Sequence, residues 1–524
     1  MGPSAQLTPT RPRQVSPRTL GGLVEHLACQ HASGSPHTTS PHTVLTGVTH
    51  ASGDAQPGDL YVALPGQRTH GARFVPEAAE RGAAAVLTDV EGARLAAPCD
   101  LPVVVVDEPR AVLGDAAAYI YGLPAHRITT IGVTGTNGKT TVTAMLHAVL
   151  TSAYSAAGLV GTIETRLGDR VVPSVRTTPE ASDLQAVLAA LVEQQIEVCA
   201  LEVSSHALAL HRVDGLVVDV AGFTNLSPDH QDFHPDMEHY FATKASLFTP
   251  ERSRRGVVTV DDMWGRRLAA TAGVPVRTLS ADPDAPDDPV VRSADWRVTG
   301  LSADGAGSRA TLVGPHGRYD LVVPMPGLVN VANAALTVAL SAEIGLDPAE
   351  SVAALADAPM VPGRMELVSG EGRPVVVVDY AHSPDALQRA LGTLRGASPE
   401  PLVVVIGAGG DRDRSKRAPM GEVAARGADV VVVTDDNPRS ENPAAIRAEV
   451  MAGARSVDPA RVHEIGDRAA AIEAAVRLAG QGTLLLAGKG HEQGQEVAGA
   501  IHPFDDRVVA RRVLQQMAAA QRSS

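Results

Sequence analysis

A glycine-rich segment with one lysine and two threonines is the strongest indication of chemistry in this sequence. It reads Gly-Val-Thr-Gly-Thr-Asn-Gly-Lys-Thr-Thr over residues 132–141, between an apolar β-rich run and a helical stretch. In such a setting glycine N–H groups and the helix amino terminus surround phosphate oxygens, Lys139 adds a positive charge, and Thr140 or Thr141 can hold Mg²⁺. The first glycine departs by one residue from the strict Walker spacing. The segment predicts a nucleotide phosphate site, but it leaves an ATPase switch, a kinase and a ligase all open.

Two polar segments downstream also follow apolar, strand-like runs. Residues 201–206 read Leu-Glu-Val-Ser-Ser-His, and residues 224–234 read Thr-Asn-Leu-Ser-Pro-Asp-His-Gln-Asp-Phe-His. Carboxylate oxygens such as those of Glu202 are suitable Mg²⁺ ligands. Several histidines and aspartates after one strand, among them His230, are suggestive in a chain that already holds a phosphate loop. We therefore expect these segments to complete the same site.

Lysine is rare in this chain. Of the 45 lysines and arginines only four are lysines, at positions 139, 244, 416 and 489. Where arginine serves most cationic positions, the remaining lysines are candidates for sites that need an amine. Lys244, in Tyr-Phe-Ala-Thr-Lys-Ala-Ser-Leu-Phe, is open to two interpretations. By composition alone it is the polar member of an amphipathic helix, and its rarity favours a site residue.

Composition and charge exclude several classes of protein. The net charge of −14, from 45 basic and 59 acidic residues, argues against a nucleic-acid binder. The three cysteines lie far apart, so neither a disulfide framework nor a zinc site is indicated. No apolar run approaches the ~20 residues of a membrane span. Residues 1–18 are predicted to be a disordered tail and not a signal peptide. We expect a cytoplasmic protein with small-molecule substrates and no obligate protein partner.

The elements that must position these residues indicate an α/β protein of several domains. A length of 524 residues is too great for one core. We expect a small α/β domain over 19–125, a central domain with a parallel sheet over 126–361, and a Rossmann-like domain over 362–524. The polar stretch 281–325 is expected to form an antiparallel edge or a hairpin excursion.

The third domain has the plainest strands. Short β-branched runs occur at 374–378, 402–406, 429–433 and 483–486, and each is followed by polar residues. Because ligands of open parallel sheets bind at the carboxyl ends of the strands, we expect a ligand site there.

Together these segments resemble the Mur ligase family. Its GTNGKT-type loop, its E-V-S-S-H and T-N-L-x-x-D-H-x-D-x-H segments and its carbamylated lysine all have counterparts here, in order. Asp-Asn-Pro-Arg at 436–439 resembles the signature of the members that recognise diaminopimelate. The resemblance covers about residues 19–515. It implies a UDP-binding first domain, a P-loop ATPase domain and a Rossmann-like domain that binds an amino acid.

The resemblance also implies a reaction in peptidoglycan precursor synthesis. ATP would phosphorylate the D-glutamate carboxylate of UDP-N-acetylmuramoyl-L-alanyl-D-glutamate. The amino group of 2,6-diaminopimelate would attack the acyl phosphate, and phosphate would leave. Such a reaction depends mainly on positioning and on charge neutralisation.

The resemblance assigns residues to the nucleotide and the metal. The ATP-binding residues would be Gly135, Thr136, Asn137, Gly138, Lys139, Thr140, Thr141, Asn330, Asn333, Arg364 and Asp379. The Mg²⁺ ligands would be Thr140, Glu202, His230 and a CO₂-derived carbamate on Lys244 (N6-carboxylysine). The catalytic set would be Lys139, Glu202, His230 and Lys244. A carbamate needs a neutral lysine nitrogen, so arginine could not replace Lys244.

The two remaining substrates are assigned in the same way. The UDP-substrate residues would be Ser52, Gln67, Arg68, Thr69, Thr177, Thr178, Ser204 and Arg212, and the chain departs from the family pattern at His50, Arg176 and Leu210. The diaminopimelate residues would be Arg412, Asp436, Asn437, Pro438, Arg439, Gly488 and Glu492. Arg412 and Arg439 can fork onto the distal carboxylate, and Glu492 can accept from the ammonium. Alternatively, residues 436–439 are only an Asx/Pro turn after a strand.

Other functions stay open at this point. The chain could be a related ligase with another acceptor, such as L-lysine or the acceptor of a folylpolyglutamate or cyanophycin ligase, or it could be a non-ligase regulatory P-loop ATPase. A lysine-adding member would have no distal carboxylate to bind and should lack Arg439. The sequence derives no role for Lys416 or Lys489, and it does not choose between meso- and LL-diaminopimelate.

Overall fold

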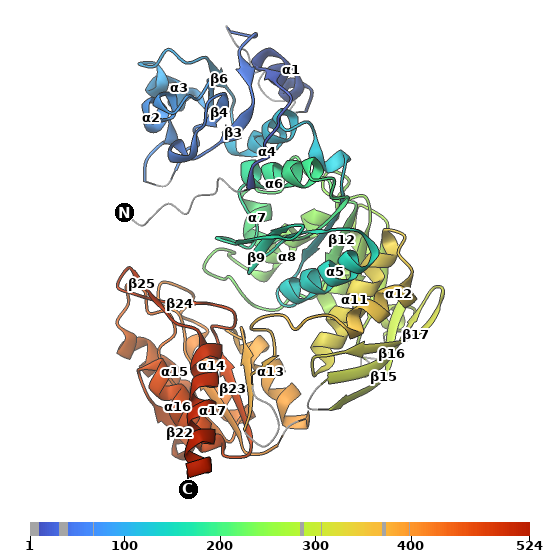
Figure 1. Ribbon diagram of the computed structural model, residues 1–524, viewed down its shortest axis with the longest axis vertical. Coiled ribbons are helices and arrows are strands. Elements are labelled where there is room, and N and C mark those ends of the chain that lie inside the picture. Colours follow the sequence, from blue (N-terminus) through green and yellow to red (C-terminus); the bar gives the residue numbers. More distant parts are fainter. Residues whose placement is uncertain are drawn as a thin grey trace.

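The computed structural model describes residues 10–30, 40–66, 68–282, 288–304, 307–368, 374–397 and 399–523. Figure 1 shows three domains in a row, with the N-terminal domain in blue, the central domain in green to yellow and the C-terminal domain in orange to red. Over the described ranges, no helix combines the length and the apolar character that crossing a membrane would require. The expected three-domain α/β architecture is confirmed.

The N-terminal domain is built on a four-stranded parallel sheet. The strands lie in the order β3 (Gly47–Thr49), β4 (Asp59–Val62), β5 (Ala85–Thr88) and β6 (Val103–Val105). Helices α2 (Val75–Glu80) and α3 (Val90–Ala96) pack on one face. Helices α1 (Leu20–Gln30) and α4 (Pro109–Ile120) pack on the other face. A two-stranded ladder of β1 (Arg18–Thr19) and β2 (Val44–Leu45) lies beside α1.

The residues before β1 differ from the expectation of a disordered tail. Arg11 forms an ion pair with Asp59 at 2.8 Å, and the backbone N–H of Arg13 donates to Glu193 at 2.9 Å. The prediction is therefore wrong for residues 10–18, because a buried carboxylate on β4 recruits the Arg11 guanidinium. Residues 1–9 lie outside the described part of the chain.

The central domain has an eleven-stranded sheet with a parallel middle. That middle is ordered β8 (Gly158–Val160), β11 (Val198–Glu202), β7 (Thr129–Thr134), β12 (Val220–Phe223), β13 (Gly256–Thr259) and β14 (Val276–Ser280). The hairpin of β9 (Glu164–Leu167) and β10 (Arg170–Pro173) extends one edge. The other edge carries β15 (Trp296–Asp304), β16 (Gly307–Gly314) and β17 (Gly317–Val323), which confirms the antiparallel excursion.

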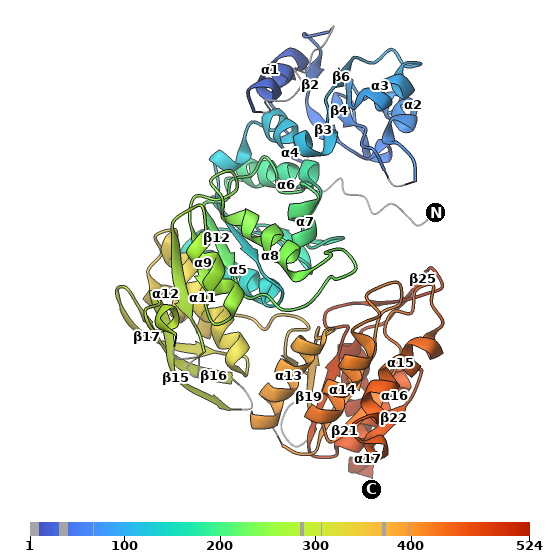
Figure 2. The ribbon, with the colours of Figure 1, turned by 180° about the vertical axis from the view of Figure 1, so that it is seen from behind.

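Helices cover both faces of this sheet, so its strands are apolar on both sides. Along β11, Val198 and Ala200 pack with α5 (Lys139–Ala153) and α11 (Leu328–Glu343), near α12 (Pro348–Ala356). Cys199 and Leu201 face the opposite way, toward α6 (Ala181–Glu193), α7 (Ser205–Ala209), α8 (Met237–Ala245) and α9 (Met263–Thr271). Figure 1 shows α5 and α11 on the near face, and Figure 2 shows α8 and α9 on the other.

The C-terminal domain is an open six-stranded sheet. Its order is β18 (Glu366–Leu367), β19 (Val375–Asp379), β23 (Thr483–Ala487), β20 (Leu402–Ile406), β21 (Val430–Val433) and β22 (Val462–Glu464), and only β18 is antiparallel. The four predicted strands are confirmed. The strand β22 reads Val-His-Glu and was too short and too polar to be predicted.

Helices and one hairpin complete this domain. The helices are α13 (Pro384–Ala397), α14 (Arg417–Gly427), α15 (Pro443–Arg455), α16 (Arg468–Ala479) and α17 (Asp506–Ser523), and the hairpin pairs β24 (Gly494–Val497) with β25 (Ala500–Pro503). Neighbouring parallel strands end at one edge of the sheet, so the polar residues after β19, β20, β21 and β23 lie together.

Candidate functional site

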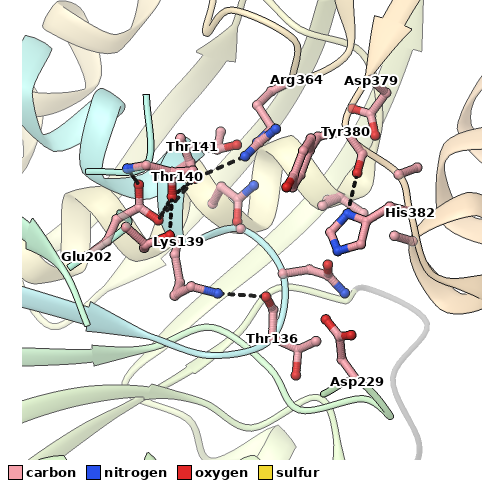
Figure 3. Close-up of a pocket in the computed structure, with 18 of the residues that line it drawn as sticks. Thr136, Lys139, Thr140, Thr141, Glu202, Asp229, Arg364, Asp379, Tyr380 and His382 are labelled. Atoms are coloured by element: carbon pink, nitrogen blue, oxygen red, sulfur yellow. Dashed lines mark hydrogen bonds between the residues drawn. The ribbon is translucent and has the colours of Figure 1, made fainter. Parts of the chain in front are cut away.

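The predicted phosphate loop connects β7 to α5, as its sequence indicated. Gly135 has φ +141° and Gly138 has φ +92°. A Cβ on Gly135 would lie 1.8 Å from the Thr224 hydroxyl, and a Cβ on Gly138 would lie 2.4 Å from the side-chain amide oxygen of Asn333, so only glycine fits. The Lys139 ammonium donates to the carbonyl of Gly135 at 2.9 Å and to the carbonyl of Thr136 at 2.8 Å. Figure 3 shows the bond to Thr136.

Glu202 lies at the end of β11 beside the start of α5. Its Oε2 accepts from the hydroxyls of Thr140 and Thr162, each at 3.0 Å, and its Oε1 accepts from the Thr162 N–H at 2.7 Å. A buried carboxylate next to a threonine at the helix start is a donor set that suits a hard cation. Thr162 was missed in the sequence, because it follows the three-residue strand β8 without any recognisable pattern.

A cavity of about 500 Å³ collects most of the predicted nucleotide residues. Its lining includes Thr136, Asn137, Gly138, Lys139, Thr140, Thr141, Asn330, Asn333, Arg364 and Asp379, together with Glu202 and His230. Gly135 does not line it. Burial lowers the pKa of Lys139, and the nearby charges of Glu202 and Asp229 offset part of that effect.

Lys244 lies behind the phosphate loop and not on the cavity wall. Its side chain is 1% exposed on α8, and its ammonium donates to the carbonyl of Gly135 at 2.7 Å. The interpretation of Lys244 as the solvated polar residue of an amphipathic helix is therefore wrong. Burial lowers the pKa of the Lys244 amine well below its usual value, and the positive charge of Lys139 adds to this shift.

The expected Mg²⁺ ligands come from four separate elements. Thr140 and Glu202 are in contact, and His230 lies on the same cavity. Burial lowers the pKa of His230 to about 3, so its imidazole is neutral and able to coordinate. Within the described ranges, no cluster of three or more His, Cys, Asp and Glu has metal-binding geometry. A metal at this site would therefore need further ligands that are not His, Cys, Asp or Glu, such as the Thr140 hydroxyl.

The C-terminal domain reaches the phosphate loop through the segment around β18 and β19. The guanidinium of Arg364 donates to the Thr140 hydroxyl at 3.1 Å and lies 4.5 Å above the Tyr380 ring (Figure 3). Asp379 accepts from the Met365 N–H at 2.7 Å, and burial raises its pKa although Arg364 opposes that shift. Arg364 and Asp379 therefore line the same cavity as the phosphate loop.

The inner part of the predicted UDP-substrate set also lines this cavity, namely Thr177, Thr178, Ser204 and Arg212. Glu180, which the sequence analysis missed, pairs with Arg212 at 3.0 Å, with Arg110 at 3.1 Å and with Arg176. Burial alone would raise the pKa of Glu180, but the surrounding positive charges, Arg212 first, lower it. The departure at Arg176 therefore has a structural partner.

The outer part of that set is not brought to the cavity. The Ser52 hydroxyl donates to Glu77 at 2.7 Å, and Arg68 and Thr69 are exposed on the N-terminal domain. Gln67 lies outside the described residues. Of the departures from the family pattern, His50 contacts the Ser182 hydroxyl at 3.2 Å, which joins the first domain to α6. Leu210 directly follows α7.

A second cavity of about 480 Å³ lies at the carboxyl ends of the third domain's strands. Its lining includes Arg412, Asp436, Asn437, Arg439, Gly488 and Glu492 from the predicted acceptor set, and also Lys416. Pro438 does not line it. Arg439 has φ +52°, donates to the Gly410 carbonyl at 2.8 Å and pairs with Glu496 at 3.2 Å. The segment is thus a turn that also forms a cavity wall.

The two cavities have a common wall. Six residues line both of them: His206, Asp229, His230, Tyr380, His382 and Arg412. Burial alone would raise the pKa of Asp229, but the interactions of its carboxylate with His230, His382 and Lys416 lower it to about 2. A group activated at the phosphate loop would therefore be within reach of a nucleophile held in the second cavity.

Models of known families match three stretches of the chain. The "Mur ligase family, catalytic domain" model matches residues 44–121, the "Mur ligase middle domain" model matches 133–341, and the "Mur ligase, glutamate ligase domain" model matches 363–490.

Curated proteins and solved structures agree with these matches. The UDP-N-acetylmuramoyl-L-alanyl-D-glutamate–2,6-diaminopimelate ligase of Streptomyces coelicolor is 50% identical over 514 residues, covering 97% of this chain and 98% of that protein. The UDP-N-acetylmuramyl-tripeptide synthetase of Leifsonia xyli is 48% identical over 480 residues, covering 90% and 92%. A solved structure of a UDP-N-acetylmuramoyl-L-alanyl-D-glutamate–2,6-diaminopimelate ligase superposes on this chain with a TM-score of 0.64. It is 30% identical, and the match covers 92% of this chain and 96% of that structure.

Proposed function

This chain belongs to the Mur ligase family, and on that premise we propose that it joins 2,6-diaminopimelate to UDP-N-acetylmuramoyl-L-alanyl-D-glutamate with the use of ATP. The observation that carries the proposal is the common wall of the two cavities. One cavity holds the phosphate loop and the other holds paired basic and acidic side chains that suit an amino-acid head group. We place the reaction in the cytoplasm, where ATP is available.

The nucleotide half of the site would bind ATP at residues 135–141. The Lys139 ammonium donates to the carbonyls of Gly135 and Thr136. Phosphate oxygens that enter the site would replace these carbonyls as its hydrogen-bond acceptors. The backbone N–H groups at the start of α5 would share the phosphate charge. Arg364, already bonded to Thr140, would hold the C-terminal domain against the nucleotide.

The residues around Glu202 fit a magnesium ion. Thr140, Glu202 and His230 would hold it, together with a carbamate on Lys244 as an oxygen donor. When bound, the ion would neutralise part of the negative charge of the phosphates. A carbamylated nitrogen keeps one N–H, so Lys244 could retain its bond to the Gly135 carbonyl while gaining two acceptor oxygens.

The acceptor half would bind diaminopimelate by its distal head group. Arg439 and Arg412 would fork onto the carboxylate, and Glu492 would accept from the ammonium. This leaves the other amino group for the shared wall. There it would attack the acyl phosphate carbonyl, form the peptide bond and expel inorganic phosphate.

The test is a phosphate-release assay on the purified full chain. Release should require UDP-muramoyl dipeptide and diaminopimelate together, and L-lysine should not replace the latter. Parallel reactions with the meso and LL isomers identify the acceptor. Phosphate release with neither substrate present would contradict the proposal and would favour a regulatory ATPase.

A further inference from the structure

Lys489 is a buried cation next to the second cavity, and the reaction outlined above gives it no role. It follows β23 in the segment Gly-Lys-Gly-His-Glu and is 0% exposed. Its ammonium donates to Glu492 Oε2 at 2.9 Å and to Asn437 Oδ1 at 3.1 Å. Both partners line the cavity, whereas Lys489 does not.

The contacts of Lys489 determine how the amide of Asn437 is oriented. An ammonium only donates hydrogen bonds, so the amide oxygen of Asn437 must face it. The same oxygen accepts from the Glu496 N–H at 3.0 Å, and the amide nitrogen donates to Glu492 Oε2 at 2.9 Å. Glu492 therefore receives two donors on one carboxylate oxygen. Among the described residues no donor contacts Oε1, which leaves that oxygen available to a ligand.

Charge gives a second reason for a cation at this position. Asp436 and Glu492 place two carboxylates on the same cavity. Asp436 also lies close to the residue before Lys489, since a Cβ on Gly488 would be 2.7 Å from Asp436 Oδ2. A buried ion pair contributes little net stability compared with apolar packing, so stability alone is a weak reason to bury Lys489. An ammonium is a compact donor that contacts two acceptors on different segments at once, and an arginine fork has a different geometry.

We propose that Lys489 is a positioning residue for acceptor recognition. It holds Glu492 and Asn437 so that the carboxylate presents one free oxygen to the distal ammonium of the amino-acid substrate. The inference rests on the proposed function and deepens it, because it identifies what orients the group that reads the ammonium.

A double-mutant cycle with Lys489→Met and Glu492→Gln tests this inference. Initial rates are measured while diaminopimelate, ATP and UDP-muramoyl dipeptide are varied in turn. Lys489→Met should raise the KM for diaminopimelate about 10- to 100-fold, the loss expected for a charge-assisted hydrogen bond, with little change in the KM for ATP. If Lys489 acts through Glu492, adding Lys489→Met to Glu492→Gln should cause little further loss.

Controls separate this role from a general loss of structure. Arg395→Met removes a cation paired with Asp429 at 2.8 Å near the amino ends of β20 and β21, and it should leave all KM values unchanged. If Lys489→Met does not fold, Lys489→Gln, an uncharged donor, replaces it in the cycle. Additive losses, or equal rises in KM for ATP and diaminopimelate, would overturn the positioning role while the ligase function stands. A wild-type chain that does not consume diaminopimelate would instead overturn the proposed function.

Discussion

The ammonium of Lys244 donates to the carbonyl of Gly135, which lies 109 residues earlier in the chain, over 2.7 Å. This bond joins α8 to the phosphate loop. Because burial lowers the pKa of this amine well below its usual value, the neutral form that reacts with carbon dioxide is populated at lower pH than for an exposed lysine.

Lys244→Arg should therefore abolish ligation while ADP binding is largely kept. A guanidinium forms no carbamate, and we expect the rate to fall by at least about a hundredfold, as for other lost electrostatic groups in active sites. Intact mass measurement of the wild type should show one added carbon dioxide that the variant lacks. Near-normal turnover of the variant would refute the carbamate.

Glu202→Gln should weaken catalysis without unfolding the central domain. Glutamine keeps an acceptor oxygen for the Thr140 and Thr162 hydroxyls, but it loses the charge that would attract Mg²⁺. We expect the Mg²⁺ concentration for half-maximal phosphate release to rise about tenfold or more, and chelation should stop the wild type. Thermal unfolding serves as the control, and an unchanged Mg²⁺ requirement would remove Glu202 from the metal site.

Arg364→Met should impair use of ATP more than use of the acceptor. Methionine can still pack on the Tyr380 ring, but it cannot donate to Thr140. Loss of one charge-assisted hydrogen bond predicts a fall of about tenfold or more in kcat/KM for ATP. Steady-state kinetics with each substrate varied gives the comparison. A fall confined to diaminopimelate would place Arg364 with the acceptor instead.

Arg439→Ala should raise the KM for diaminopimelate about 10- to 100-fold and leave the KM for ATP nearly unchanged, because a carboxylate loses its charged partner. The preference for diaminopimelate over L-lysine should become smaller in the same variant. L-lysine has no distal carboxylate, so its binding loses no contact when Arg439 is removed. Equal effects on both KM values would mean that the Asp-Asn-Pro-Arg segment serves only as a turn.

Arg468→Met should destabilise the C-terminal domain. Arg468 at the start of α16 and Asp506 at the start of α17 are both 0% exposed and pair at 2.7 Å. Breaking a buried pair leaves an uncompensated charge, which costs about 3–5 kcal/mol of unfolding free energy. Urea unfolding measures this, and the double variant Arg468→Met/Asp506→Leu should recover most of the loss. An unchanged urea midpoint would contradict the prediction.

The sequence by itself determined those features whose signals are local. The phosphate loop is contiguous, and its glycine, lysine and threonine pattern can be read within residues 132–141. The side chains of Thr224 and Asn333, which leave no room for a Cβ at Gly135 and Gly138, come from far along the chain. The β-branched runs of the third domain predicted four of its strands, because parallel strands buried on both faces must be apolar throughout. Short or polar elements such as β22 carried no such signal, and neither did the segment held by Arg11.

The tertiary structure decided which distant groups meet. Thr162 reaches Glu202 and Lys489 joins Glu492 to Asn437 because the order of strands within each sheet brings their ends together. Arg364 reaches Thr140 because the C-terminal domain packs against the central domain. The tertiary structure also placed Ser52 away from the cavity that the inner part of the predicted UDP-substrate set lines. Sequence spacing does not encode these pairings, since a contact across two domains depends on how whole sheets and helices pack and not on any local preference.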